Sequence, residues 1–454
     1  MPETTLTTPE QKEEIISYLE SQQAGKFRKA YLDLHVYEQA QIFSELDETQ
    51  RNRIYRYLSP VEMGDMFNAI EEEPDQVVNY FKEMIPQYAA DVIYEMYTDN
   101  AVDILAYAKA KDLNQYLELL PAEAAVEIRG MLHYQDKTAG AIMSTEYVAI
   151  TGNQTVRSAL HVMKKEALDA ETIYYIYVID DEENLQGVLT LRDLLTNDDD
   201  ALISDIMNRP VMSVDVQEDQ EEVAQTIRDY NFIALPVTNP EGKMIGIINV
   251  DDIIDVIDEE SAQDYSGLAG VDVDNLPSNP WQAALKRLPW SLGLLILGIT
   301  TAFVISWYQI LIQKDTLMVT FIAMVMGASG NAGTQSLAVS ATRIADKDDE
   351  EESTAKMVAN EALTGLIVGF FSGILFAVIT GIWQQDLDFG LILGLALLIA
   401  VTISNVLGCL LPIIFKKLGK DASNVPGALV STISDLLSAL IYFGTIQIFW
   451  NLYH

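Results

Sequence analysis

Residues 425–450 read VPGALVSTISDLLSALIYFGTIQIFW, an apolar run that is long enough to cross a lipid bilayer. Asp435 is the only acidic or basic side chain in this run. A charge at bilayer depth is costly unless it faces water, an ion or a partner, so Asp435 is a candidate functional group. Carboxylate oxygens without Cys or His nearby favour a hard cation such as Mg²⁺ or Ca²⁺. The alternative is a structural Asp that is protonated or paired with a neighbouring helix.

Four more apolar stretches reach spanning length, at 288–312, 316–340, 362–384 and 389–415. The basic residues test this count of five spans. With the N-terminus inside, eight Lys and Arg residues flank the spans on the cytosolic side and one lies outside, as the positive-inside rule requires. Five spans therefore place His454 outside. The cytosolic set is Lys286, Arg287, Arg343, Lys347, Lys356, Lys416, Lys417 and Lys420, and the external residue is Lys314.

The composition of the chain changes near residue 280. Residues 1–280 hold 55 of the 67 acidic and 19 of the 28 basic residues, which gives −36 of the total net charge of −39. Such an acidic half would repel nucleic acid and suits cations. The single Cys409 excludes a disulfide framework, and the N-terminus lacks the basic and apolar regions of a signal peptide. We therefore expect a multi-pass protein of the cell (plasma) membrane whose residues 1–280 remain in the cytosol.

Residues 10–130 have the apolar spacing of short amphipathic helices, for instance at Val92, Ile93 and Met96. No strand pattern interrupts them, so we predict an all-α domain over residues 1–132. Prolines mark several of the expected helix starts, at Pro60, Pro74, Pro86 and Pro121.

A tandem repeat follows over residues 133–253. Gly187 and Gly246 are 59 residues apart, and so are Asp193 and Asp252. Each copy predicts a buried strand, a glycine turn, a second strand and a helix that begins at an Asp cap. This pattern resembles a tandem pair of CBS domains, which implies an α/β fold.

The resemblance to CBS pairs implies a site for an adenine nucleotide such as ATP in the cleft between the copies. Thr190, Arg192 and Asp193 match the family's pattern for phosphate and ribose contacts, and the aromatic rings of Tyr175 and Phe232 could enclose a base. The structural alternative is that Asp193 only caps its helix and that Arg192 pairs with a surface acid. The second copy lacks the Arg, so at most one site is expected.

An acidic helix begins at the end of the repeat and leads through residues 254–280 to the first span. Asp251, Asp255 and Asp258 share one face of this helix, where like charges repel unless cations screen them. A charge run is usually a solvated face. The position of this one, directly before the membrane domain at residues 281–454, indicates that it can transmit movement to the spans.

The second span contains the motif Gly327-Ala-Ser-Gly-Asn-Ala-Gly-Thr-Gln-Ser336. Small residues allow close helix packing, but Asn331, Thr334 and Gln335 also need partners or water. Polar groups at membrane depth are tolerated where they line a cavity. The fourth span has a weaker counterpart at Thr402, Ser404 and Asn405.

Together these segments resemble the MgtE family of magnesium channels. The specific matches are the motif at 327–336, the sequence KKLGKD at 416–421 and the sequence STISD at 431–435. The resemblance implies a homodimer with a central pore, in which Asp435 is the selectivity carboxylate and the acidic helix is a gating plug. The expected pore lining is Gly330, Asn331, Thr334, Gln335, Gly427 and Ala428.

The resemblance also implies that cytosolic Mg²⁺ bridges acids of the soluble half and closes the pore when Mg²⁺ is plentiful. The matching positions are Asp99 and Asp103 in the N-terminal domain, Glu221 in the second CBS copy, Asp252, Asp255, Glu260 and Asp264 on the plug, and Asp421 at the cytosolic mouth of the pore.

Three positions depart from the family pattern. The family often has acids where this chain has Asn231 and Gln263, and its proline near position 428 stands here as Pro426. Two sensor positions could therefore be weaker, which predicts inhibition at a higher Mg²⁺ concentration than in a typical relative.

Other classes of protein fit the chain less well. An anion transporter would need basic groups within its spans, and an enzyme would need a catalytic motif, which the four scattered histidines do not provide. A membrane-anchored nucleotide sensor would not need polar residues inside the spans. The choice of Mg²⁺ against Mn²⁺, Co²⁺ or Ca²⁺ remains open, as does channel against coupled carrier.

Overall fold

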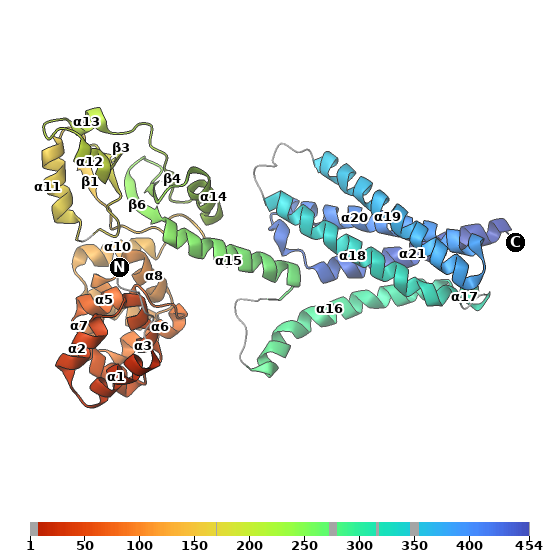
Figure 1. Cartoon of the computed structure of the whole chain (residues 1–454), viewed down its shortest axis with the longest axis horizontal. Helices are drawn as coiled ribbons and strands as arrows, with labels where there is room; N and C mark the ends of the chain where they lie inside the picture. Colours follow the sequence, from red (N-terminus) through yellow and green to blue (C-terminus); the bar gives the residue numbers. More distant parts are fainter. Residues whose placement is uncertain (1–7, 169, 272–278, 315–316, 346–353, 454) are drawn as a thin grey trace. The chain divides into compact units, whose positions relative to one another are not determined.

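The computed structural model describes all residues except 1–7, 169, 272–278, 315–316, 346–353 and 454. Lys347, His454 and part of the link at 254–280 thus lie outside the described residues. The chain forms two compact units, Met1–Ile257 and Asp258–His454, and the division falls within one helix, α15 (Val250–Ala269). The two units are described separately below (Figure 1).

The first unit begins with ten short helices, as the apolar spacing predicts. Odd-numbered helices pack on odd-numbered ones from α3 to α9, and even-numbered helices pack on even-numbered ones from α6 to α10. Pro60, Pro74 and Pro86 stand in the first turn of α5, α6 and α7, and Pro121 is the N-cap of α10. The ten helices are α1 (Pro9–Glu20), α2 (Ala24–Leu32), α3 (Val36–Ser44), α4 (Glu48–Tyr57), α5 (Pro60–Phe67), α6 (Pro74–Glu83), α7 (Pro86–Glu95), α8 (Thr98–Ala106), α9 (Ala110–Leu119) and α10 (Ala122–Met131).

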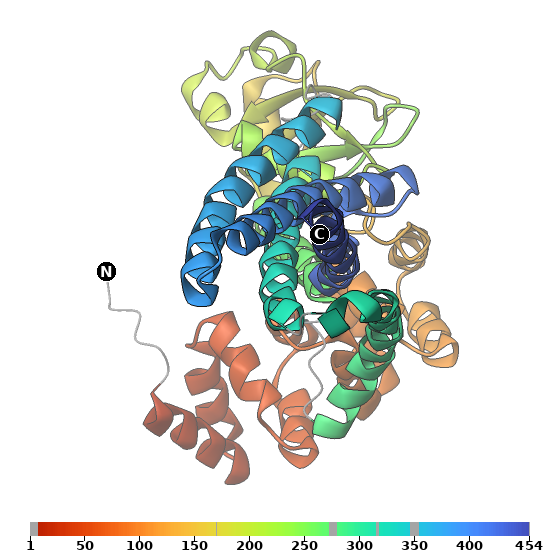
Figure 2. The ribbon, with the colours of Figure 1, turned by 90° about the vertical axis from the view of Figure 1, so that its right-hand side faces the viewer.

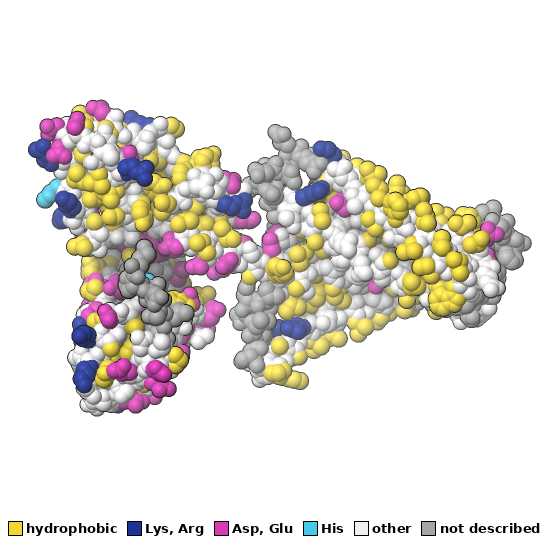
Figure 3. Space-filling model, in the orientation of Figure 1, with side chains coloured by type: hydrophobic (Ala, Val, Ile, Leu, Met, Phe, Trp, Pro, Cys, Tyr) yellow, Lys and Arg dark blue, Asp and Glu magenta, His cyan; other side chains and the backbone are white. Residues whose placement is uncertain are grey.

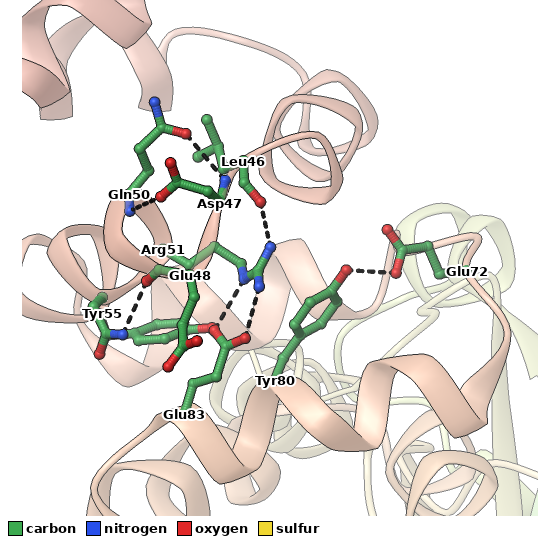
Figure 4. A network of polar contacts seen from close by, with 10 residues as sticks. Leu46, Asp47, Glu48, Gln50, Arg51, Tyr55, Glu72, Tyr80 and Glu83 are labelled. Carbon is green, nitrogen blue, oxygen red and sulfur yellow. Dashed lines mark hydrogen bonds and ion pairs between the residues drawn. The ribbon is translucent and has the colours of Figure 1, made fainter.

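A polar network joins α4 to α6 inside this helical stack (Figure 4). Arg51 of α4 forms two hydrogen bonds with the carboxylate of Glu83 on α6, at 2.6 and 2.9 Å, and its guanidinium lies 4.6 Å from the centre of the Tyr80 ring. Tyr55 donates a further bond to Glu83, at 2.9 Å. Since both charged side chains are largely buried, the bidentate pairing offsets the cost of removing them from water.

Two three-stranded sheets follow, with the same topology. In each sheet the first strand pairs in parallel with the second, and the second pairs antiparallel with the third. The strands are β1 (Ala149–Thr151), β2 (Tyr175–Ile179), β3 (Leu185–Thr190), β4 (Val214–Asp215), β5 (Ala234–Thr238) and β6 (Met244–Asn249); the helices around them are α11 (Val156–Glu166), α12 (Leu191–Thr196), α13 (Ile203–Ile206), α14 (Gln220–Tyr230) and the start of α15.

The repeated glycines lie inside strands, which corrects the prediction of a glycine turn. Gly187 lies in β3 and Gly246 in β6, each opposite a valine of the neighbouring strand. A Cβ at Gly187 would lie 2.4 Å from the sulfur of Met207, and one at Gly246 would lie 2.8 Å from the sulfur of Met143. The glycine of each copy therefore leaves room for a methionine near the start of the other copy, which indicates that the two copies fold as one body.

The helix after β3 also differs in detail from the prediction. Thr190, not Asp193, is the N-cap of α12. Asp193 stands three residues later, and its carboxylate accepts hydrogen bonds from the Thr190 backbone at 2.8 Å and from the Thr190 hydroxyl at 2.7 Å. This reciprocal pairing is a capping box, in which the acid at the third helical position completes the cap.

The second unit consists of long apolar helices whose hydrophobic side chains cover most of the face visible in Figure 3. Four helices within the described residues are long and apolar enough to span a membrane: α16 (Pro280–Trp307), α19 (Thr354–Gln384), α20 (Leu387–Lys417) and α21, over Gly427–Phe449. The remaining predicted span, the second in chain order at 316–340, coincides with α18 (Leu317–Ala345), which is 29 residues long but carries the polar motif in its second half. The remaining elements are α17 (Gln309–Lys314), η2 (Ala422–Asn424) and α21 in full (Gly427–Tyr453).

Glycines bring α19 and α20 into close contact, and the two helices lie side by side in both views (Figure 1, Figure 2). A Cβ at Gly373 would lie 2.6 Å from the carbonyl oxygen of Gly394, and one at Gly394 would lie 2.5 Å from that of Gly373. Backbone approach of this kind is how helices associate when lipid removes the hydrophobic drive between them. The fold thus agrees with the expected class: a helical N-terminal part, an α/β CBS pair and a helical membrane part.

Candidate cation sites and nucleotide cleft

The N-terminus of α8 is fixed against the start of the CBS pair by Glu146. The carboxylate of Glu146 accepts hydrogen bonds from the backbone and the hydroxyl of Thr98, the first residue of α8. It also accepts bonds from the Ser144 hydroxyl at 2.8 Å and the Thr145 backbone at 3.1 Å. A carboxylate at a helix N-terminus is favoured by the helix dipole. These bonds set the position of the next residue of the helix, Asp99.

Asp99, Glu171 and Asp252 form a compact carboxylate cluster in the first unit. One oxygen of each residue lies within 4.8 Å of the others, and this is the group of potential metal ligands found among the described residues. Asp99 is 6% exposed, and the other two are partly buried. The three residues come from α8, from the segment before β2 and from the first turn of α15. The cluster therefore joins the helical stack, the first CBS copy and the acidic helix.

Burial and the charges of nearby carboxylates raise the pKa of all three carboxyl groups. Burial raises the pKa of Asp99 well above its ordinary value, and Asp252 and Glu171 add to the effect. Burial and the charge of Glu171 raise the pKa of Asp252 to about 7. Burial also raises the pKa of Glu171, although hydrogen bonding partly opposes it. Three carboxyl groups at such distances do not all stay ionised unless a cation compensates their charge; otherwise at least one of them takes up a proton.

The surroundings of the cluster fit a hydrated hard cation. Mg²⁺ takes oxygen ligands and usually keeps several waters beside one or two carboxylates. Asn249 borders the site, since its backbone donates to the Asp252 carboxylate at 3.3 Å. The Asn249 side chain is 4% exposed, and no hydrogen bond reaches its oxygen within the described part of the chain, while its amide nitrogen lies close enough to the Glu171 carboxyl to lower the pKa of that group. A water shell around an ion would provide such an amide with partners.

The other predicted acids lie on the same or nearby elements but outside this cluster. Asp103 is exposed one turn after Asp99 on α8, and Asp255 is exposed one turn after Asp252 on α15. Glu221 lies in the first turn of α14, where its backbone donates to the N-cap Asp219 at 2.9 Å. In the second unit, Glu260 and Asp264 are partly buried on α15, and Asp421 is the N-cap of η2.

In the membrane part, Asp435 is half-buried on α21 and lies close to the small-residue motif of α18. A Cβ at Gly330 would lie 2.8 Å from the Ser431 hydroxyl and 3.8 Å from a carboxylate oxygen of Asp435. The absence of a side chain at position 330 therefore leaves room for this carboxylate. A second contact joins the start of α18 to the later part of α21: the Tyr442 hydroxyl donates to the Met318 carbonyl at 2.8 Å.

The remaining predicted pore-lining residues lie along the same two helices. A Cβ at Gly427 would be 3.6 Å from the Thr334 methyl group, and the Ala428 carbonyl accepts a bond from Thr432 at 2.7 Å. Asn331 and Gln335 are exposed on α18. The six residues thus form two groups that are distant in sequence, four on α18 and two on α21, and Asp435 lies on α21 as well.

The C-terminal end of α15 packs against the start of α21 within the second unit. A Cβ at Gly267 would lie 2.5 Å from the Ser423 carbonyl oxygen in η2. Gly270 ends the helix with φ at +67°, a conformation that glycine adopts without strain. A Cβ there would be 3.1 Å from Pro426, which precedes α21. The acidic helix therefore reaches the segment that leads directly into the span of Asp435.

A cleft of about 350 Å³ lies between the two CBS copies. Tyr175 and Phe232, the two aromatic residues predicted to enclose a base, both line it. The ring of Tyr230 stacks on Phe232 with 5.6 Å between the ring centres. The other lining residues are Tyr177, Val188, Asn208, Pro210, Val211, Met212, Ala234, Leu235 and Pro236.

The three residues expected to contact phosphate and ribose do not line this cleft. Thr190 and Asp193 are engaged in the capping box of α12, and Arg192 is exposed on the first turn of that helix. The arrangement can thus hold a flat aromatic group against its rings, and Asn208 places an amide side chain in the lining.

The fold and these sites are those of a multi-pass membrane transporter for divalent cations that carries a CBS pair. A family model described as a divalent cation transporter matches residues 322–445, a model of the MgtE intracellular N domain matches residues 34–137, and CBS domain models match residues 139–199 and 203–259. The chain belongs to the MgtE family of magnesium transporters, as the sequence motifs indicated, and this is a family of transporters rather than enzymes.

Three relatives support this assignment. The magnesium transporter MgtE of Enterococcus faecalis is 50% identical over 435 residues, which cover 96% of each chain. The magnesium transporter MgtE of Bacillus subtilis is 32% identical over 95% of each chain. A crystal structure of the soluble part of a magnesium transporter is 55% identical, with a TM-score of 0.54, and covers 56% of this chain and 99% of that one.

Two residues at these sites escaped the sequence reasoning. Glu171 completes the carboxylate cluster, yet it is an isolated acid in front of an apolar strand, and only the pairing of strands brings it near Asp99. Glu361 is a second carboxyl within an apolar helix, and it is 6% exposed on α19. Its position at the edge of the predicted third span hid it, because charges at span ends are common.

Proposed function

We propose that this protein carries Mg²⁺ across the cell membrane through a pore in which Asp435 is the selectivity carboxylate. The observation that supports this most is the position of Asp435 on α21 opposite Gly330, beside the polar motif of α18. A hydrated Mg²⁺ would meet the carboxylate and the polar groups through its own waters, which suits an ion that dehydrates reluctantly. The pore is formed by two copies of the chain, with the N-terminal unit in the cytosol and the C-terminus outside.

We propose further that cytosolic Mg²⁺ inhibits this transport through the cluster of Asp99, Glu171 and Asp252. The cluster spans the helical stack, the CBS pair and α15, so a cation bound there links all three. Without a cation, repulsion among the carboxylates weakens that link. The other acids that the family pattern points to (Asp103, Glu221, Asp255, Glu260, Asp264 and Asp421) supply additional cation contacts around the same helix.

The inhibition is tested by Mg²⁺ flux into proteoliposomes while Mg²⁺ on the cytosolic side is varied from sub-millimolar to tens of millimolar. Asp252→Asn and Glu171→Gln should each shift half-inhibition to Mg²⁺ concentrations about tenfold higher, as expected for a coupling of about 1–2 kcal/mol. Glu123→Gln, at an exposed position in the first turn of α10, is the matched control and should leave the curve in place. Unchanged inhibition in both cluster variants would remove the cluster from the sensor.

A second proposal is that the cleft between the CBS copies binds an adenine nucleotide such as ATP. The aromatic lining by Tyr175, Tyr230 and Phe232 favours it, because a purine ring gains from stacking. Titration of the full chain with a fluorescent ATP analogue should give saturable binding that Phe232→Ala weakens about tenfold. Tyr174→Ala, at an exposed position away from the cleft lining, should bind normally. Equal binding by all three proteins would place the nucleotide elsewhere.

A further inference from the structure

We propose that Glu361 is a positioning residue of the pore, which holds the polar motif of α18 in register with Asp435 through a hydrogen bond to Ser336. The proposal rests on the proposed pore at Asp435 and adds to it a part of the structure that lies outside the pore lining. It assigns a function to a buried carboxyl group that neither the cation cluster nor the plug helix uses.

Glu361 is buried in a place where a carboxyl group needs a partner. It is 6% exposed and lies seven residues into α19, which is about 10 Å along the helix axis. The Ser336 hydroxyl of α18 lies 2.8 Å from a carboxyl oxygen of Glu361. The same hydroxyl lies 2.8 Å from the backbone carbonyl oxygen of Asn405 on α20. One serine thus connects three helices.

The acceptors around Ser336 show what position 361 must supply. The Ser336 hydroxyl donates toward the carboxyl oxygen of Glu361 and toward the carbonyl oxygen of Asn405, and because a serine hydroxyl has one hydrogen, the two acceptors share it. The side-chain oxygen of a glutamine accepts in the same way as a carboxyl oxygen. The clamp therefore needs an acceptor oxygen at position 361 rather than a charge.

The clamp lies six residues, nearly two helical turns, after Gly330, the residue of α18 that meets Asp435. A Cβ at Gly333 would lie 2.9 Å from the Ser434 hydroxyl of α21 and 3.1 Å from the Ser404 carbonyl of α20. A Cβ at Gly408 would lie only 2.2 Å from the Gly333 carbonyl. With backbones in such close contact, a small rotation or slide of α18 would move Gly330 away from Asp435. Ser336 and Glu361 oppose that movement from the side of α18 that faces α19 and α20.

Two readouts distinguish positioning from simple structural damage. The first is total Mg²⁺ flux into proteoliposomes, which falls with any loss of folded protein. The second is the ratio of Mg²⁺ flux to Ca²⁺ flux, which does not depend on how much protein is folded but does depend on the geometry at Asp435. The variants are Glu361→Ala, Glu361→Gln and Ser336→Ala, with Thr364→Ala as control on the exposed side of the same helix.

Glu361→Ala and Ser336→Ala should each lower Mg²⁺ flux about tenfold, since each leaves buried polar groups without a partner, and should lower the Mg²⁺ to Ca²⁺ ratio. The double variant should be no worse than either single one. Glu361→Gln should keep the wild-type ratio and most of the flux, and Thr364→Ala should match wild type.

A Glu361→Gln variant as impaired as Glu361→Ala would overturn the proposal, because it would show that the charge matters. An unchanged ion ratio in Glu361→Ala would do the same. Failure of the proposed pore is recognised separately. In that case an Asp435→Ala variant would transport Mg²⁺ as fast as wild type.

Discussion

Asp99, Glu171 and Asp252 show how the surroundings of a carboxylate decide its chemistry. Glu146, next to them, accepts four hydrogen bonds and so stabilises its charge with protein donors alone. The cluster residues have few such donors and lie near one another, so a cation would supply what the protein does not. The same residue type therefore serves as a structural acceptor at position 146 and as a candidate ligand at the cluster.

A partly buried tyrosine of the CBS pair, Tyr147, makes stability depend on pH. Burial and the charges of Glu183 and Glu127 raise the pKa of Tyr147 to about 12, against 10.0 for an exposed tyrosine. Because the folded state holds this proton more tightly, its stabilising effect is complete below pH 10 and is lost as the pH rises towards 12. The loss amounts to about 2–3 kcal/mol.

Tyrosine absorbance during alkaline titration of the full chain measures this effect. The difference between wild type and Tyr147→Phe should contain one ionisation step near pH 12, and the variant should lose less stability between pH 10 and 12. The hydroxyl donates only a long bond of 3.3 Å to the Met244 carbonyl, so the variant should be nearly as stable as wild type at neutral pH. An ionisation step near pH 10 in this difference would contradict the prediction, because it would show that Tyr147 ionises like an exposed tyrosine.

At the scale of elements, glycines allow the closest approaches in the membrane part. Gly373 and Gly394 bring α19 against α20, and Gly330 and Gly333 bring α18 against α21 and α20. Gly267 does the same for the end of α15, whose backbone meets that of η2. If α15 gates the pore as the family resemblance implies, this contact is where its movement reaches α21.

Gly267→Ala tests this contact. A Cβ at position 267 would lie 2.5 Å from the Ser423 carbonyl oxygen, so α15 must withdraw from η2. The half-inhibiting concentration of cytosolic Mg²⁺ should rise about fivefold or more in the liposome flux assay. Gly293→Ala on α16 is the matched control, because a Cβ there meets no atom within 4 Å. Normal inhibition in Gly267→Ala would exclude this contact from gating.

The sequence predicted elements better than the contacts between them. Apolar spacing and prolines located the helices of the N-terminal stack, and the repeat at Gly187 and Gly246 revealed the CBS pair. The predicted role of those glycines as turn residues was wrong. Each one lies in a strand and makes room for a methionine from the other copy, and a contact between copies leaves no local pattern in the sequence. Glu171 was missed for the same reason: its neighbours come from α8 and α15, which are distant in sequence.

Asn231 illustrates a position that sequence could identify but not explain. It ends α14 with φ at 54°, a left-handed conformation that asparagine tolerates better than most residues. Asn231 therefore has a backbone role at a position where the family resemblance implies an acid. A neutral residue at this position should also weaken the binding of inhibitory Mg²⁺. We therefore expect half-inhibition of flux at a higher cytosolic Mg²⁺ concentration than in a typical relative.

At the scale of the whole molecule, the chain combines an acidic unit with an apolar one. The first 280 residues carry a net charge of −36, so divalent cations would reduce their self-repulsion. The apolar unit concentrates its polar groups on α18, α20 and α21. Under the proposed inhibition, an acidic half that binds the same ion that the membrane half transports would give a direct basis for feedback.

The central claim is that Asp435 is the carboxylate through which Mg²⁺ passes. The most direct measurement is Mg²⁺ flux into proteoliposomes at low cytosolic Mg²⁺, for wild type, Asp435→Asn and Asp435→Ala. We predict that both variants fall to about the level of empty liposomes, because neither the amide nor the methyl group can replace a charge at this depth. Flux that is undiminished in both variants would contradict the assignment of the pore.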